Sequence, residues 1–197
     1  MFLPDSAARD FLTTSVAAPF WLCHGFLGFE GLMAAVYEDG ELLAKLLGRV
    51  TENTVTQVRR QALAGVYDVV WIEDCYSSAD LISLDQFRRF ALPYVARVVE
   101  AVNAAGMASV YYFCGKVDDR LEDLIELAPT AIALEESKKD FHLELGEVVQ
   151  QVTGRCCVFG NLDAIHTLRR GTPDQVRSAI CHQLEAGRCA RRFVVSL

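Results

Sequence analysis

The sequence predicts an α/β fold in which about six parallel strands alternate with helices. Three observations lead to this prediction. Short, nearly continuous apolar runs recur along the chain, as is typical of strands buried on both faces. Segments with apolar residues at helical spacing lie between these runs. Explicit helix starts and stops separate the two kinds of segment, and such repetition implies parallel strands joined by right-handed crossovers.

The predicted strands are the apolar runs at residues 20–23, 69–72, 109–114, 131–134, 156–159 and 193–197. The second run continues directly into Glu73 and Asp74, so this strand is expected to end in two acids. Because side chains alternate along a strand, one of these carboxylates should face the inside of the sheet and the other the helices or the loop.

The predicted helices cover residues 41–64, a long segment between Ser83 and Gly106, and residues 119–127, 141–152 and 173–186. Two of them begin with a capping box, at residues 83–86 and 172–175. Pro93 lies inside the long segment, so we expect a kink or break near Leu92.

Two ways of closing the sheet compete, an open doubly wound sheet and a (β/α)8 barrel. No glycine-rich phosphate loop follows any predicted strand, which disfavours the nucleotide-binding version of the doubly wound fold. The last residues, FVVSL, form a strand without a covering helix. We therefore interpret residues 1–197 as a single domain that is an incomplete TIM-type barrel.

The composition indicates a globular protein without a nucleic-acid or membrane partner. The net charge is -7, and basic residues form only short pairs. No apolar run approaches the ~20 residues that span a bilayer, and the first residues lack the pattern of a signal peptide. Seven cysteines without paired-motif spacing argue against a disulfide framework, so a cytoplasmic location is expected.

Four segments in order resemble one known family. They are IEDCYSSADLISLDQFRRFALPY, YYFCG, FGNLDAIHTLRRGTPDQV and FVVSL. Their succession is similar to the uroporphyrinogen decarboxylase superfamily, which also contains zinc-dependent cobamide (methylcobamide:thiol) methyltransferases. The resemblance implies a (β/α)8 barrel whose site lies at the carboxyl ends of its strands. It also implies that the family's N-terminal strands precede Met1 and that its final segment follows Leu197.

The resemblance carries over only in part to the family's functional residues. The methyltransferase branch binds zinc through H-x-C-G and a later cysteine. Cys114 and Gly115 match the second half of that motif, Tyr112 occupies the histidine position, and the last ligand would fall beyond Leu197. The decarboxylase branch binds its tetrapyrrole carboxylates largely through arginines of an N-terminal motif that residues 1–197 do not contain.

Polar residues at strand ends are the candidates for a site, because such side chains converge on the mouth of a barrel. We predict catalytic roles for Glu73, Asp74, Glu135 and Glu136, substrate binding by Tyr112, Asn161 and Asp163, and metal binding by Cys114. Cys75, His24 and Ser196 also lie at or after the ends of predicted strands and are further candidates for the mouth.

Each candidate also has a purely structural interpretation. A carboxylate can order the loop that follows it, a free cysteine is often a small buried apolar residue, and Asn or Asp readily bonds its own turn. Tyr112 can pack within the barrel, and either Glu135 or Glu136 can pair with Lys138 or Lys139. The cysteines outside the mouth, Cys23, Cys156, Cys157, Cys181 and Cys189, are expected to be structural.

Three functions remain open at this level. The favoured one is metal- and thiol-assisted methyl transfer that depends on a corrinoid, with zinc as cofactor and a corrinoid protein or a methylated small molecule as partner. The first alternative is decarboxylation of a uroporphyrinogen-type tetrapyrrole without a cofactor. The second is a non-catalytic barrel fragment that binds a ligand or partner, since exposed sheet edges need covering. A homo-oligomer is compatible with all three.

Overall fold

A computed structural model describes residues 11–136, 141–152, 154–190 and 192–196. Within these residues one parallel sheet holds β1 (Thr13–Ala17), β2 (Val69–Asp74), β3 (Ala108–Phe113), β4 (Ala131–Leu134), β5 (Cys157–Phe159) and β6 (Phe193–Val194). The strands lie in chain order from β1 to β6. A doubly wound sheet would require a reversal of that order. The prediction of an incomplete (β/α)8 barrel is therefore confirmed.

The sheet is curled, as a barrel wall must be. The rings of Trp71 on β2 and Phe159 on β5 meet edge to face with centroids 5.3 Å apart. In a flat sheet, strands three positions apart are separated by about 14 Å. The small residues Ala131 and Ala133 on β4 leave room for this contact on the concave face. We call this concave side, which carries Trp71, Tyr112 and Phe159, the inner face.

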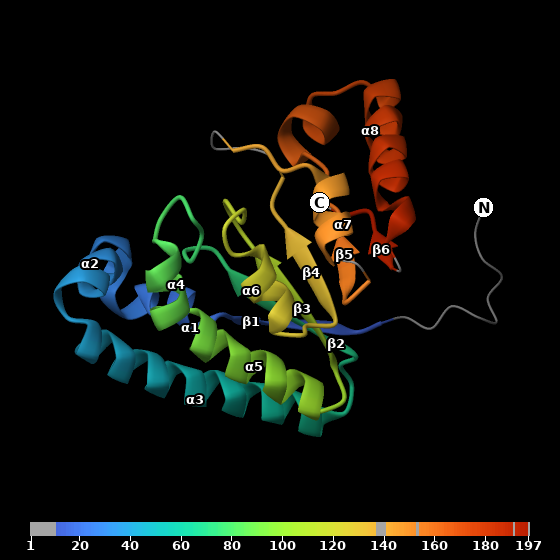
Figure 1. The fold of residues 1–197 in the computed structure, drawn as a ribbon. Helices are drawn as coiled ribbons and strands as arrows, with labels where there is room; N and C mark the ends of the chain where they lie inside the picture. Colours follow the sequence, from blue (N-terminus) through green and yellow to red (C-terminus); the bar gives the residue numbers. More distant parts are fainter. Residues whose placement is uncertain (1–10, 137–140, 153, 191, 197) are drawn as a thin grey trace.

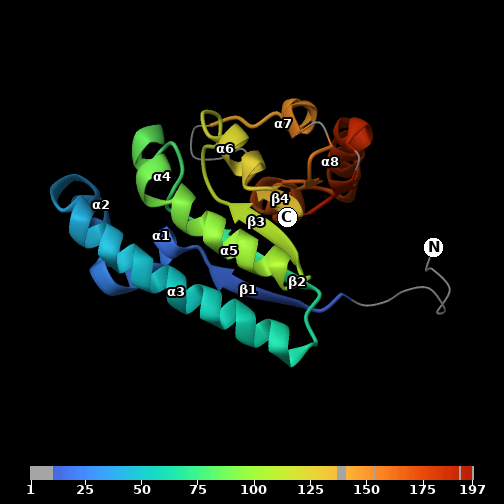
Figure 2. The same cartoon turned by 60° about the horizontal axis from the view of Figure 1, so that its bottom comes forward.

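Helices pack on the other face of the sheet and on one another. They are α1 (Pro19–Leu22), α2 (His24–Glu38), α3 (Gly40–Ala64), α4 (Leu84–Phe90), α5 (Leu92–Ala104), α6 (Leu121–Glu126), α7 (Leu145–Val152) and α8 (Pro173–Ala186). Helices α3 and α5 run side by side along the sheet (Figures 1 and 2). The main core fills the space between sheet and helices, with Ile72, Phe113 and Ile132 pointing into it.

The first predicted strand was wrong. Residues 20–23 belong to α1 and its C-terminal end, and the first strand is instead β1 at Thr13–Ala17. Pro19 starts the helix, and Phe20 and Cys23 are buried, so a four-residue apolar run looked the same in either state. The strand TTSVA was not predicted, because its first three residues are polar. Several of its side chains are exposed, as is typical of a strand at the edge of a sheet.

Other boundaries follow the sequence more closely. Both capping boxes are formed, at Ser83 and Thr172, and the long helical segment breaks at Ala91 between α4 and α5, as Pro93 predicted. The helix expected at 141–152 begins only at Leu145, and the strand expected at 193–197 is confined to β6. Helix α2 and a π-helical turn at Ala164–Arg169 were not predicted.

A buried arginine holds the loop between β2 and α4. The side chain of Arg120 has no solvent exposure, and its guanidinium donates to the backbone carbonyls of Ser77 and Ile82. It also stacks over the ring of Phe87 and bonds the carboxylate of Asp119. Buried carbonyl groups need such partners, so Arg120 fixes the path of the chain directly after β2.

Replacing Arg120 with alanine should lower the free energy of unfolding by about 2–5 kcal/mol, because two buried carbonyls lose their donor. Urea unfolding measures the loss. The matched control Arg177→Ala removes an exposed arginine from α8 and should stay within about 0.5 kcal/mol of wild type. Equal stabilities for the two variants would contradict the role given to Arg120.

Candidate active site

Two cysteines meet at the carboxyl ends of neighbouring strands. Cys75 follows β2 and Cys114 follows β3, and the backbone N–H of Cys114 donates to the Asp74 carbonyl at 2.8 Å, so the two residues continue the strand register. Their Sγ atoms are 3.4 Å apart. Cys75 is half-buried, whereas Cys114 is 8% exposed. We call these two residues the thiol pair.

The two thiols of this pair differ in acidity. The hydrogen bond with Cys114 lowers the pKa of Cys75, and this effect outweighs partial burial and the nearby carboxylates of Asp74, Glu73 and Glu135. The same hydrogen bond, together with burial, raises the pKa of Cys114. Cys75 is therefore the member that ionises first, with the Cys114 thiol as the donor that stabilises its thiolate.

The loops behind the thiol pair are tied to each other by the main chain. The Ala79 N–H donates to the Lys116 carbonyl at 2.9 Å, and the Lys116 N–H donates to the Asp80 carboxylate at 3.0 Å. Gly115 adopts φ +98°, and a Cβ there would lie 2.5 Å from the Ser78 hydroxyl. Only glycine permits this approach. These contacts keep the two sulfurs at their observed separation.

Tyr112, Glu135 and Glu73 lie beside the thiol pair on the inner face. Alternation along β3 places Tyr112 with Val110 and Cys114, and Tyr112 packs edge to face on Trp71 at 6.4 Å. Burial raises the pKa of Tyr112, with contributions from Cys114 and Glu135. Glu135 follows β4 and is only 6% exposed. The mouth thus gathers two thiols, a phenol and carboxylates from three adjacent strands.

Asp74 lies on the opposite face of the sheet from this group. Its carboxylate accepts hydrogen bonds from the hydroxyls of Ser77 at 2.6 Å and Tyr111 at 2.8 Å, and from the Tyr76 N–H at 3.4 Å. Burial raises its pKa, although these hydrogen bonds oppose the shift. Of the two acids that end β2, Glu73 faces the inside and Asp74 the helices.

The candidates after β5 take part in local structure. Asn161 donates to the Glu135 carbonyl at 3.3 Å and accepts from Gln183 at 3.4 Å, so it links the end of β4 to α8. Asp163 caps the turn at Ala164–Arg169, and its carboxylate also bonds the ring of His166 at 2.9 Å. Substrate binding by these two residues stays a prediction.

The remaining candidates are placed as follows. The His24 ring bonds the Trp21 carbonyl at 2.6 Å and packs against Tyr76, which agrees with the structural interpretation. Glu136 directly follows Glu135 and is half-buried. The expected pairing of a glutamate with Lys138 or Lys139 lies outside the described residues. Ser196 accepts a hydrogen bond from the Leu162 N–H through its carbonyl.

The described residues contain no group of three or more His, Cys, Asp and Glu side chains that could hold a metal ion. The thiol pair supplies two sulfurs, and Tyr112 occupies the position where the resemblance expects a histidine. Catalytic zinc takes about three protein ligands. The described part of the chain therefore offers two of the donors that such a site requires.

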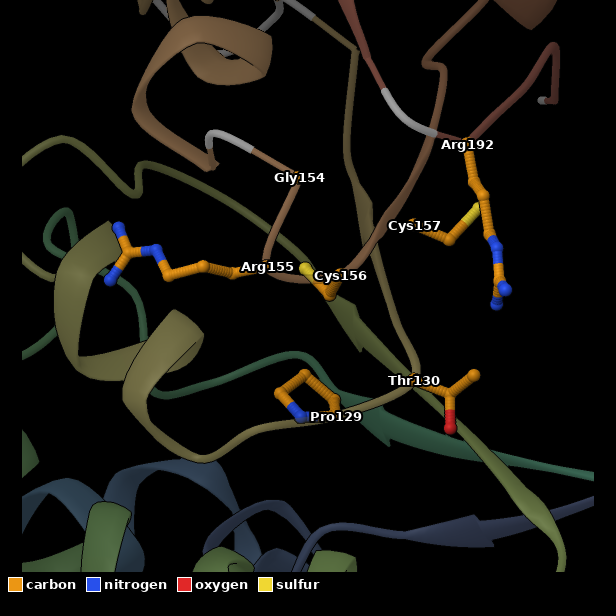
Figure 3. Close-up of a pocket in the computed structure, with 7 residues that line it drawn as sticks. All are labelled: Pro129, Thr130, Gly154, Arg155, Cys156, Cys157 and Arg192. Carbon is orange, nitrogen blue, oxygen red and sulfur yellow. The ribbon is translucent and has the colours of Figure 1, made fainter.

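A second group of cysteines lies at the other end of the sheet. Cys156 and Cys157 line a cavity of about 190 Å³ with Thr130, Arg155 and Arg192. Figure 3 shows Arg155 pointing away from the two cysteines and Cys157 lying next to Arg192. Arg155 binds Glu122 through both of its terminal nitrogens, at 2.5 and 2.9 Å. This cavity is remote from the mouth, as the structural interpretation of these cysteines expected.

A comparison with protein families identifies the family to which this chain belongs. The family model described as uroporphyrinogen decarboxylase (URO-D) matches residues 9–197. The chain belongs to the uroporphyrinogen decarboxylase family. The described part of the chain has no helix with the length and apolarity needed to cross a membrane.

Relatives within the uroporphyrinogen decarboxylase family carry two kinds of name. Uroporphyrinogen decarboxylase of Chlorobaculum parvum is 28% identical over 170 residues, which is 86% of this chain and 44% of that protein. The methylcobamide:CoM methyltransferase MtbA of Methanosarcina mazei is 25% identical over 173 residues, 88% of this chain and 49% of that protein. The chain thus spans less than half the length of these relatives.

A solved structure agrees on the fold. A methyltransferase from Methanosarcina mazei superposes with a TM-score of 0.82 at 22% identity, covering 97% of this chain and 54% of that one. At this identity the match establishes the barrel architecture rather than the reaction. Cys114 lies at the mouth, as its place after a predicted strand indicated, whereas the contact between Cys75 and Cys114 was not predicted.

The lowered pKa of Cys75 should depend on the donor at position 114. Cys114→Ala removes that donor, so the pH at which iodoacetamide alkylates Cys75 at half its maximal rate should move upward. Cys114→Ser retains a hydroxyl donor and should keep the midpoint nearer that of wild type. Peptide mass spectrometry over a pH series measures the rates, and identical profiles for wild type and Cys114→Ala would refute the interaction.

The buried carboxyl of Asp74 should make stability depend on pH. Because its pKa is raised on folding, its contribution is fully present below the unfolded value of about 4 and is lost as pH rises through the folded value. The stability of wild type relative to Asp74→Asn should therefore fall as pH rises. Urea unfolding at several pH values tests this, and a difference that grows with pH would show that Asp74 is stabilised as the carboxylate.

Proposed function

We propose that this chain forms part of the catalytic mouth of an enzyme that transfers a methyl group between a corrinoid and a thiol. The observation that carries the proposal is the thiol pair, whose sulfurs lie 3.4 Å apart at the carboxyl ends of β2 and β3. In barrels of this type the site lies at that end of the strands. Relatives named methylcobamide:CoM methyltransferases from Methanosarcina mazei and Methanosarcina barkeri support the choice.

The reaction sets specific demands on the mouth. The substrate thiol would have to lose its proton and form a bond from sulfur to the methyl carbon, while a methylated corrinoid would supply the methyl group and keep both electrons of the broken bond. In this proposal Glu73 and Glu135, whose charges act on the Cys75 thiol, accept the proton of the substrate thiol. Tyr112 has a hydroxyl on the same face and stays protonated because burial raises its pKa, so it can donate to a substrate group.

Zinc is the cofactor that the proposal includes. When bound, zinc lowers the pKa of a thiol and presents the thiolate at neutral pH. Cys114 is the residue of this chain that would hold it, with Cys75 as the adjacent second sulfur. The described residues supply only these two donors together, so further ligands must come from outside them.

Decarboxylation of a uroporphyrinogen-type tetrapyrrole is the second candidate. It is favoured by Tyr112, which occupies the position where the resemblance to the methyltransferase branch expects a zinc-binding histidine, and by relatives named uroporphyrinogen decarboxylase. In that reaction a fixed carboxylate would stabilise positive charge that develops on a pyrrole ring. Glu73 and Glu135 are the carboxylates at the mouth that could do so, and the thiol pair would have no part.

The intact protein that contains this chain should demethylate methylcobalamin in the presence of 2-mercaptoethanesulfonate. The absorbance change of the corrinoid and the mass of the methylated thiol measure the reaction. Cys114→Ala should reduce the rate roughly tenfold or more, as loss of an ordering or ligating group typically does. The matched control is Cys157→Ala, which removes an inner-face cysteine at the opposite end of the sheet.

The same preparations distinguish the alternatives. Zinc content close to one per protein, lost in Cys114→Ala and kept in Cys157→Ala, would support the metal part of the proposal. Zinc absent from wild type and variant alike would refute it. Carbon dioxide release from uroporphyrinogen without methyl transfer would replace the proposed function by decarboxylation.

A further inference from the structure

We propose that Cys75 and Cys114 are a modification site, a dithiol that small-molecule disulfides oxidise to a reversible disulfide across the mouth. The proposal rests on the geometry of the thiol pair and not on the enzyme's reaction. It concerns both sulfurs equally, whereas the resemblance to the family pointed to Cys114 alone.

The backbone already has the spacing that a disulfide requires. Cys75 and Cys114 occupy adjoining positions of neighbouring strands, because the Cys114 N–H bonds the Asp74 carbonyl and Asp74 pairs with Phe113. Neighbouring strands are about 4.8 Å apart, which lies inside the range of about 4.4–6.8 Å that Cα atoms of disulfides span. The sulfurs, at 3.4 Å, need only side-chain rotation to reach bonding distance.

Hydrogen bonds between the loops after β2 and β3 keep the two sulfurs close together. The hydrogen bonds that join Ala79 and Asp80 to Lys116 tie the segment after Cys75 to the segment after Cys114. Gly115 lets Ser78 pack directly on the backbone beside Cys114. The two sulfurs are therefore held as neighbours, and forming the bond requires no rearrangement of the sheet.

The different exposure of the two cysteines determines which one reacts first with a small-molecule disulfide. Cys75 is half-buried and can be reached from the mouth, whereas Cys114 is 8% exposed. The Cys75 thiolate attacks one sulfur of glutathione disulfide and releases the first glutathione thiolate. Cys114 then loses its proton and attacks the Cys75 sulfur, which releases the second. Two protein thiols and one glutathione disulfide thus become one protein disulfide and two glutathione thiols.

The other cysteines lack this arrangement. Cys156 directly precedes β5 and packs in the main core, whereas Cys157, the first residue of β5, lies on the inner face, so the two side chains point to opposite sides of the sheet. Cys23 is fully buried in the main core, while Cys181 and Cys189 are exposed on and after α8. Among the described cysteines, a thiol–thiol contact within hydrogen-bond distance is recorded for Cys75 and Cys114.

The disulfide would remove both sulfurs from the chemistry of the mouth. A thiol substrate or a soft metal ion can no longer use either atom once the bond has formed, and reduction restores both. The modification would therefore act as a reversible block on any reaction that needs the thiol pair.

The test is peptide mapping of the intact protein after exposure to glutathione disulfide. Remaining thiols are blocked with iodoacetamide, and trypsin, which cleaves after lysine and arginine, is applied without reductant. Residues 61–88 and 98–116 then form separate peptides that contain Cys75 and Cys114, respectively, as their sole cysteine. We expect these two peptides to be joined in more than half of the recovered material and to separate after dithiothreitol.

Variants make the assignment specific. Cys75→Ser and Cys114→Ser should each abolish the joined peptides, while Cys157→Ser should leave their yield unchanged. A stable glutathione adduct on Cys75 with a free Cys114, or no joined peptides in wild type, would overturn the proposal. Since no activity is measured, this failure is separate from a failure to transfer methyl groups, and the wild-type result stands even where a variant does not fold.

Discussion

The arrangement of the mouth depends on where the carboxyl group of Asp74 is fixed. On the helix side of the sheet it accepts hydrogen bonds from the hydroxyls of Tyr111 on β3 and of Ser77 in the following loop. Since side chains alternate along a strand, fixing Asp74 outward forces its two neighbours, Glu73 and Cys75, inward. A one-residue slip of β2 would reverse all three side chains. The buried carboxyl group of Asp74, which lies outside the mouth, thus determines which side chains of β2 point into the mouth.

A second set of constraints acts on the loops and not on the strands. Arg120 satisfies the carbonyls of Ser77 and Ile82, and the main chain at Ala79 and Lys116 joins the two loops that leave β2 and β3. These are mostly backbone contacts, so they tolerate changes of side chain around them. A mouth built in this way can keep its shape when an individual side chain, such as that of Tyr112, is replaced.

The sequence predicted the architecture well where a pattern had a single physical meaning. Capping boxes at Ser83 and Thr172, and the break before Pro93, depend on local chemistry and were confirmed. The run at 20–23 had two meanings, because four consecutive apolar residues suit a helix or a strand, and Pro19 at the start of α1 favours the helix. The strand Thr13–Ala17 begins with three polar residues, so it contains no apolar run of the kind that marks the other strands.

Less of the candidate site could be predicted, because the site depends on distances between side chains of different strands. The sequence indicated that Glu73 and Asp74 face opposite ways, but not which one faces inward. That depends on Tyr111, which is 37 positions away along the chain. The contact of Cys75 with Cys114 likewise depends on the register of β2 against β3. The spacing of apolar residues within either strand carries no information on that register.

The order of the strands has a consequence for the way in which this chain acquires its structure. Every strand pairs with the next one along the chain, from β1 to β6, so each pairing closes a loop that holds only the intervening segment. Loop-closure entropy grows slowly with loop length, and sequential pairings keep each such cost small. The sheet can therefore grow by adding one strand–helix unit at a time, so that β2 and β3 and the sulfurs they carry can be in place before β6 has emerged from the ribosome.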